Sequence, residues 1–240
     1  MVDSMMQKRI GSDFQLPQPS VERVGRKVLF NGDLDENSFA QLQKILFEME
    51  LEDDEIGYQG NAETALGGIA CMLESESNEL TDKEEKDIIK IINQYKKNIK
   101  KQDTTDREPI HLYLNSFGGS LYDCLGIVDL IRNLKTPIHS YCFGKCMSAG
   151  MVVFACCDKR FISENSTVML HQLSGGYIGK YQDMEENVEE SRRMQKLMED
   201  LIMINTYIDE DFLEELKYRK FDCYLDAEQC IEMGIADEII

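Results

Sequence analysis

The sequence predicts an α/β fold with parallel strand pairs. From Pro109 onward, short apolar segments typical of strands alternate with longer amphipathic segments typical of helices. Repeated strand, helix and strand units pair their strands in parallel through right-handed crossovers, which defines this class. The length of 240 residues and the hydrophobic share of 42% suit one well-buried domain with a sizeable appendage.

The N-terminal residues 1–25 should form an extended or mobile arm, because they are polar, contain Pro17 and Pro19 and show no clear period. The folded domain should then begin with a short strand at 27–32 (KVLFNG), which a turn closes. Asp35 leads into a helix whose apolar residues recur at helical spacing. These residues are Phe39, Leu42, Ile45, Leu46 and Met49.

The range 52–108 differs in character from the sequence on either side. It opens with an acidic, glycine-bearing stretch, LEDDEIGYQGNAE, whose run Glu52–Glu55 we expect to be a solvated loop. A weak helix (TALGGIACML) and a strong helix beginning at Thr81, with Glu84 completing a capping box, should follow. We therefore predict an inserted, mostly helical subdomain at 52–108 between core segments 26–51 and 109–240.

The core elements follow in order after Pro109. Strands are predicted at 110–116 (IHLYLNS), 137–144 (PIHSYCFG), 159–163 (KRFIS) and 167–172 (TVMLHQ). Helices are predicted at 118–134, 147–157, from about Gln182 to Thr206, and near 210–217 and 227–233, before a final IADEII. Met184, Val188, Met194, Met198 and Leu201 form one apolar side of the long helix.

Composition limits the partners. The net charge of −19 argues against nucleic acid and acidic membranes, since phosphate contacts need clustered Lys and Arg, so proteins or peptides are the expected partners. The longest apolar run, 146–157, is too short to span a bilayer. Eight cysteines without an apolar leader suit reduced thiols in a cytoplasmic protein. The absence of a CxxC pair or a histidine cluster predicts neither a metal site nor a bound cofactor.

Two strand-to-helix junctions are candidate site segments, since ligands of α/β sheets bind at the carboxyl ends of strands. The first is 113–120 (YLNSFGGS), where Gly118 and Gly119 permit close backbone approach and leave N–H groups unhindered. The second is 141–150 (YCFGKCMSAG), in which Ser148 opens a helix. Taken alone, the glycine pair is consistent with a simple turn, and the serine with a helix N-cap.

A serine nucleophile needs a base, and His171 is the best placed of the three histidines. It ends a strand directly before the glycine-rich SGGYIG, whereas His111 and His139 lie away from strand ends. A carboxylate should orient the imidazole. The late acidic candidates are Asp209, Asp211, Asp222 and Asp226. Asp209 and Asp226 can cap helices, whereas Asp222, in the extended piece FDCYL, has no such local role and is the better candidate to pair with His171.

These segments, in this order, resemble the Clp protease proteolytic subunit family. NSFGG is similar to its N-S-P-G-G, GKCMSAG to its G-x-x-x-S-M-[AG] and VMLHQLSGG to its V-M-I-H-Q-P-x-G-G. DCYLDAEQCIEMGIADEI is similar to the family's C-terminal signature. The resemblance runs from about Lys27 to Ile240, interrupted by the insertion.

The resemblance implies a serine endopeptidase with Ser148 as nucleophile, His171 as general base and Asp222 as orienting acid. The backbone N–H groups of Gly119 and Ala149 would form the oxyanion hole. It also implies the spiral fold shared with crotonases, in which GGYIGK and the long helix project as a handle. Heptameric rings, stacked in pairs, would cleave polypeptides that a Clp-family unfoldase ATPase delivers.

This sequence departs from the family pattern at three places that bear on the site. Phe117 and Leu173 stand where the family has prolines, so the peptide-binding edges should differ in shape. Phe221 stands where an arginine used between rings is common, which bears on ring stacking. The insertion could change or replace the usual partner, and the N-terminal arm could be a propeptide or an axial gate.

Three other functions compete with this interpretation. An inactive ring or scaffold subunit would use the insertion for protein interaction, although drift would soon remove one of three catalytic residues. An acyl-CoA enzyme of the crotonase kind would share the spiral fold but has no need of a serine and histidine set. A dyad of Ser148 with Lys145 would place the base on the approaching strand.

Overall fold

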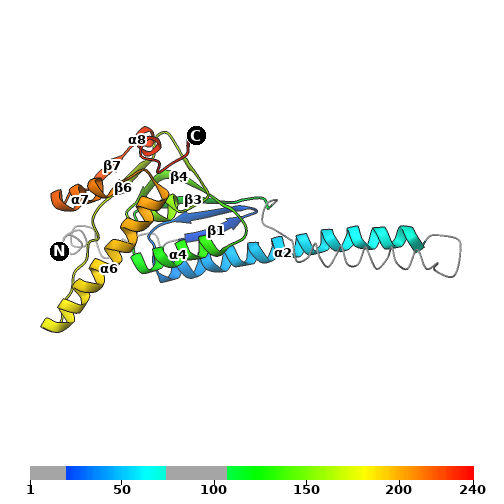
Figure 1. Cartoon of the computed structure of the whole chain (residues 1–240), viewed down its shortest axis with the longest axis horizontal. Helices are drawn as coiled ribbons and strands as arrows, with labels where there is room; N and C mark the ends of the chain where they lie inside the picture. The colour runs from blue at the N-terminus through cyan, green and yellow to red at the C-terminus, as the bar shows by residue number, and fades with distance from the viewer. Residues whose placement is uncertain (1–19, 74–106) are drawn as a thin grey trace, which may run out of the picture.

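The computed structural model describes residues 20–73 and 107–240 of the chain. Its strands form one eight-stranded sheet that carries helices against its faces (Figure 1). The strands are β1 (Ser20–Val24), β2 (Lys27–Asn31), β3 (Ile110–Ser116), β4 (Ile138–Met147), β5 (Lys159–Ile162), β6 (Thr167–Leu170), β7 (Cys223–Leu225) and β8 (Glu238–Ile239). The helices are α2 (Glu36–Leu73), α4 (Leu121–Asn133), α5 (Ala149–Ala155), α6 (Tyr181–Asn205), α7 (Glu210–Arg219) and α8 (Ala227–Glu232).

The sheet confirms the predicted α/β class. Its main path runs β1-β2-β3-β4-β5-β8, and every pair after the antiparallel β1–β2 ribbon is parallel. Strand β4 belongs to two neighbours at once: its first half pairs with β5 and its last residues, Lys145 to Met147, pair with β6. The end of β4 thereby leaves the main path and meets β6, which pairs antiparallel with β7.

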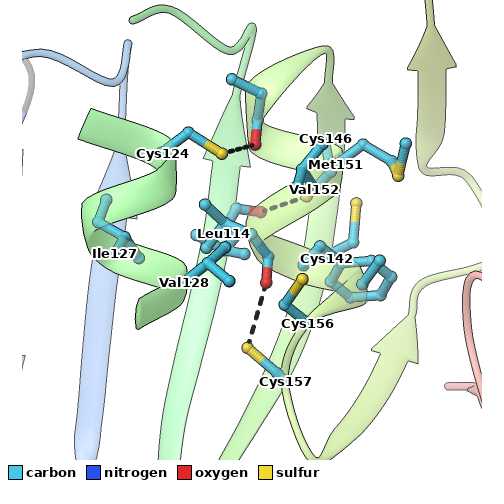
Figure 2. Packing of buried hydrophobic residues seen from close by; sticks show 14 of the residues in the cluster. Leu114, Cys124, Ile127, Val128, Cys142, Cys146, Met151, Val152, Cys156 and Cys157 are labelled. Atoms are coloured by element: carbon cyan, nitrogen blue, oxygen red, sulfur yellow. Dashed lines mark hydrogen bonds between the residues drawn. The ribbon is translucent and has the colours of Figure 1, made fainter. Parts of the chain in front are cut away.

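The core is densest around the short helix α5. Every residue of α5 is buried, as expected of a helix that is apolar all round. Helix α4 packs beside it through one apolar face. Figure 2 shows the thiols of Cys124, Cys146 and Cys157 donating to the backbone carbonyls of Ala149, Leu114 and Val153. The seven described cysteines are all free thiols.

The domain begins earlier than predicted. Residues 20–24, expected within the N-terminal arm, form β1 and pair with β2 from Ser20↔Asn31 to Val24↔Lys27. A tight turn joins the two strands at Gly25, whose φ of 60° favours glycine. The hairpin signal V-G-R-K was missed because only one of its two turn residues is a typical turn former.

The acidic run at 52–55 is helical, so the prediction of a solvated loop there was wrong. Helix α2 continues without a break from Glu36 to Leu73, and its second half extends away from the sheet (Figure 1). Three arginines of the body pair with the run: Arg23 with Glu52, Arg26 with Asp53 and Arg107 with Asp54. These partners stabilise helical backbone that its glycines alone would weaken. The helix predicted from Thr81 lies outside the described residues.

The C-terminal elements match their predictions closely. Helix α6 spans Tyr181–Asn205, and Asp209 and Asp226 cap α7 and α8 as expected. Asp226 forms the predicted capping box with Gln229. Within the described parts of the chain, no helix is both long enough and apolar enough to cross a membrane.

Candidate active site

Ser148 stands at the end of β4 in an unusual backbone conformation. Its φ of 53° and ψ of −126° lie in a region that non-glycine residues rarely adopt. Its N–H donates to the carbonyl of Met169 on β6 at 2.8 Å, and α5 begins at the next residue. Although Ser148 occupies the N-cap position, its side chain makes no capping hydrogen bond. The hydroxyl is therefore directed elsewhere.

The Ser148 hydroxyl faces the imidazole of His171. Nε2 of His171 lies 2.7 Å from Oγ of Ser148, a hydrogen-bond distance. The register Met147↔Met169 between β4 and β6 explains the contact, because it brings the residues just beyond each pair to the same end of the ladder. Sequence reasoning placed both residues at strand ends, and the structure brings them together.

Asp222 lies on the other side of the imidazole. Its Oδ1 is 3.7 Å from Nδ1 of His171, beyond hydrogen-bond length but close enough for electrostatic attraction. The antiparallel register Leu170↔Cys223 between β6 and β7 sets the two residues opposite each other. The Asp222 side chain is 53% exposed. The side chains of Ser148, His171 and Asp222 thus lie in one continuous line.

The Gly118–Gly119 pair packs directly against Ser148. Gly118 has a φ of 101°, and a Cβ there would meet the Met147 carbonyl oxygen at 2.7 Å and the Ser148 Cβ at 2.8 Å. Leu34 secures the loop, since its N–H donates to the Gly118 carbonyl and its carbonyl accepts from Ser120. Among the described backbone hydrogen bonds, the N–H groups of Gly119 and Ala149 have no acceptor. They remain able to bind an oxygen near Ser148.

The other candidate residues lie elsewhere. Lys145 lies on β4, where its Nζ donates to Asn115 Oδ1 at 3.0 Å and sits 4.1 Å from the centroid of the Phe117 ring. Within the described structure it makes no hydrogen bond to Ser148, which weakens the dyad alternative. His111 Nδ1 contacts the Tyr141 hydroxyl at 2.9 Å, and His139 packs edge-on against His111. Both histidines thus belong to an aromatic stripe across β3, β4 and β5.

A metal ion or a reactive thiol is the other chemistry to consider near Ser148. In the described residues, no group of three or more His, Cys, Asp or Glu side chains is arranged to hold a metal ion. Burial raises the pKa of the Cys146 thiol well above its ordinary value, and raises that of Cys223 as well. Both cysteines are therefore protonated near neutral pH and are poor nucleophiles.

A cleft of about 690 Å³ adjoins His171. The segment Gln172–Gly175 and helices α6 and α7 line it, including Gln195, Glu199 and Lys217. These polar residues were missed, since the helical period assigned α6 only an apolar stripe rich in methionine. No sequence signal marked Glu199, because a charged residue on a mostly polar helix gives no sign that it is buried.

The fold is that of an α/β protein, and the line of side chains from Ser148 to Asp222 is a candidate site for hydrolysis by a serine. Comparison with known proteins gives the family. The profile of the Clp protease family matches residues 77–240, more than half of the chain. The chain therefore belongs to the Clp protease family. The matched segment begins inside the range 52–108 that the sequence analysis assigned to an insertion.

Curated relatives share the C-terminal part of the chain. The chain is 33% identical over 141 residues to "ATP-dependent Clp protease proteolytic subunit 1" of Rhodopirellula baltica, covering 58% of this chain and 61% of the relative. It is 33% identical over 135 residues to the protein of the same name from Salinibacter ruber, covering 55% and 57%. The Deinococcus radiodurans proteolytic subunit is 30% identical over 135 residues, covering 55% and 65%. The chain thus spans about three fifths of the length of these relatives.

Proposed function

We propose that this protein is a serine endopeptidase that cleaves unfolded polypeptides through an acyl-enzyme. The observation that carries the proposal is the 2.7 Å contact between Ser148 Oγ and His171 Nε2, beside two backbone N–H groups without an acceptor. A serine within hydrogen-bond reach of a base, beside such donors, is the arrangement that acyl transfer requires. Membership of the Clp protease family supports the same reaction.

The proposed mechanism uses the same residues in both half-reactions. His171 Nε2 takes the Ser148 proton as Oγ attacks the scissile carbonyl carbon. The N–H groups of Gly119 and Ala149 stabilise the tetrahedral oxyanion. His171 then gives its proton to the leaving amine, and the acyl group stays on Ser148. Water, deprotonated by His171, releases the acyl group in the same way.

Asp222 would hold the imidazole in the tautomer that leaves Nε2 free to accept a proton. The 3.7 Å separation is longer than a hydrogen bond, and catalytic contacts often shorten only when substrate binds. The high exposure of Asp222 weakens its attraction to the imidazolium through solvent screening. We therefore assign Asp222 a supporting role that grows as the site closes.

The peptide would bind along the two loop edges that border Ser148. Phe117, which is 63% exposed, stands on the glycine-loop edge beside Lys145. Leu173 stands on the opposite edge, next to the cleft under Gln172–Gly175. These two side chains replace the prolines expected from the family pattern, so we propose that they shape which peptides fit.

We propose that the peptidase works in the cytoplasm as a homo-oligomeric ring of seven subunits, and that two such rings can stack. A Clp-type unfoldase ATPase would supply its substrates. The relatives' names describe ATP-dependent proteolytic subunits, which supports an ATPase partner. The core would comprise 20–51 and 109–240, with 52–108 as an inserted segment that binds a partner. Enclosure in a ring would keep an unselective protease from the surrounding proteins.

Labelling with a fluorophosphonate probe tests the proposal directly. The native assembly should become covalently labelled at Ser148, and Ser148→Ala should abolish the labelling, while Ser20→Ala, on the edge strand β1, leaves it unchanged. Mass spectrometry of the modified peptide identifies the site. Absence of labelling in correctly assembled protein would contradict the proposal and favour an inactive scaffold subunit.

A further inference from the structure

We infer that Gln195, Glu199 and Lys217 form a positioning relay that holds His171 and Asp222 at their working separation. The inference rests on the proposed peptidase function and adds to it three residues that need not touch the substrate. The relay is a chain of hydrogen bonds from the segment after His171, across helix α6, to helix α7, which leads to Asp222.

The relay has a fixed direction. The backbone N–H of Leu173 donates to Gln195 Oε1 at 2.7 Å. Because a backbone N–H can only donate, the Gln195 amide must point its oxygen at Leu173 and its NH₂ group away. That NH₂ group donates to Glu199 Oε1 at 2.8 Å, and the same oxygen accepts from Lys217 Nζ at 2.9 Å. Each member thus fixes the orientation of the next.

The ends of the relay lie close in sequence to the catalytic residues. Leu173 follows His171 after one residue, and Lys217 lies in the last turn of α7, shortly before Asp222. The β6–β7 ladder ends at the pair Leu170↔Cys223, so His171 and Asp222 both lie on irregular segments just beyond it. The relay therefore links the segments that carry His171 and Asp222 a second time, beyond the end of the β6–β7 ladder.

The burial of Glu199 indicates that the relay is more than a surface ion pair. Glu199 is 7% exposed, and it is the only charged residue among the buried side chains of the described chain. A buried carboxylate is strongly unfavourable unless it is paired and hydrogen-bonded. The neighbouring pair Lys196–Asp200 has the same helical spacing as Gln195–Glu199 but lies open to solvent, so it provides a matched control.

The test compares Gln195→Met and Lys217→Met with Lys217→Arg and Lys196→Met in the full-length native assembly. For each, kcat and kcat/KM for a short fluorogenic peptide are measured as a function of pH, together with the fluorophosphonate labelling rate and the melting temperature. Glu199→Gln, which keeps the size but removes the charge, replaces any of these variants that fails to assemble.

We expect Gln195→Met and Lys217→Met to lower kcat about ten- to a hundredfold, the effect of a small misplacement of a catalytic group. The acid limb of the kcat/KM profile should move to lower pH, because a more distant Asp222 stabilises the protonated imidazole less. Lys217→Arg should restore most of the rate, since arginine keeps the pair with Glu199. Lys196→Met should behave as the wild type.

Other results would overturn the inference. An unchanged rate and pH profile in Gln195→Met, with an active wild type, would show that the relay does not position the site. A lower melting temperature with an unmoved acid limb would assign these residues a structural role only. An unlabelled and inactive wild type would instead contradict the proposed function, and the inference with it.

Discussion

Ser148 has an unfavourable backbone conformation that directs its hydroxyl into the candidate site. A positive φ at a serine costs about 1–3 kcal/mol, and the surrounding structure must supply that energy. The hydrogen bond to Met169 fixes the residue from one side, and the fully buried α5 fixes it from the other. The result is a hydroxyl that faces His171 and does not cap its own helix.

Gly119 offers a test at the same scale. Its φ is 143°, and an added Cβ would lie 2.2 Å from the Leu34 carbonyl oxygen, so Gly119→Ala must separate the loop from Leu34 and displace the Gly119 N–H. We expect a loss of stability of about 1–3 kcal/mol and the loss of fluorophosphonate labelling. The matched control is Gly176→Ala, where an added Cβ would meet nothing within 4 Å. Thermal unfolding and labelling rates check both, and a fully labelled Gly119→Ala would contradict the assignment.

Among the elements, α2 is the one whose behaviour depends most on remote partners. Its first turns lie in the core through Leu42, Leu46 and Met49, which are fully buried. The acidic run then binds the body at the point where the helix leaves it. Asp53 accepts from Arg26 at 2.6 Å and from the Thr136 hydroxyl at 2.8 Å. These contacts of Asp53 with Arg26 and Thr136, here called the base clamp, determine the direction in which the second half of α2 projects.

The clamp should make the protein's stability depend on pH. Burial alone would raise the pKa of Asp53, but hydrogen bonds from Arg26 and Thr136 outweigh it and lower the pKa. A carboxylate with a depressed pKa stabilises the fold above its unfolded pKa, and this contribution is lost as the pH falls through the folded value. Asp53→Asn should therefore lower stability by about 1–3 kcal/mol at neutral pH, and the difference from wild type should shrink in acid.

Urea unfolding at several pH values and hydrogen exchange of the α2 amides measure this effect. Glu48→Gln is the matched control, because its pair with Lys44 lies on an exposed face of the same helix at 3.8 Å. We expect that variant to differ little from wild type at any pH. A constant difference between Asp53→Asn and wild type down to strongly acidic pH would contradict the clamp.

At the scale of the whole molecule, α6 joins a buried half to an exposed half. Met194, Met198 and Ile202 pack into the core, whereas Met184 and Val188 are 42% and 43% exposed on the first half. Exposed apolar residues in one row along a projecting helix are typical of a surface that another subunit covers. The net charge of −19 per chain opposes such assembly through self-repulsion.

We therefore expect the assembly to depend on this row. Replacing Met184 and Val188 together by glutamate should reduce the mass of the native assembly, because it adds buried charge to the proposed contact. The secondary structure of the subunit should persist, since both side chains lie outside the core. Native mass spectrometry and circular dichroism give the two readouts. An assembly of unchanged mass would exclude this face of α6 as a subunit contact.

The elements that alternate from β3 to α6 could be predicted from the sequence, because each has its own hydrophobic period and is bounded by residues typical of turns and caps. The sequence could not give the registers Met147↔Met169 and Leu170↔Cys223, which set Ser148, His171 and Asp222 in line, since register depends on packing between distant segments. The helical run at 52–55 escaped prediction for the same reason: its arginine partners come from far along the chain. Glu199 escaped because a charge on a mostly polar helix gives no sign that it is buried.

The bridge between Leu34 and Gly119 has a mechanical consequence. Leu34 stands just before α2, and its N–H and carbonyl grip the loop that carries the Gly119 N–H. Helix α2 begins two residues after Leu34 and runs without a break from the core, past the arginine pairs at 52–54, into its projecting half. The start of α2 and the glycine loop are therefore joined through backbone hydrogen bonds of Leu34, so a displacement of the helix start moves the loop that packs against Ser148.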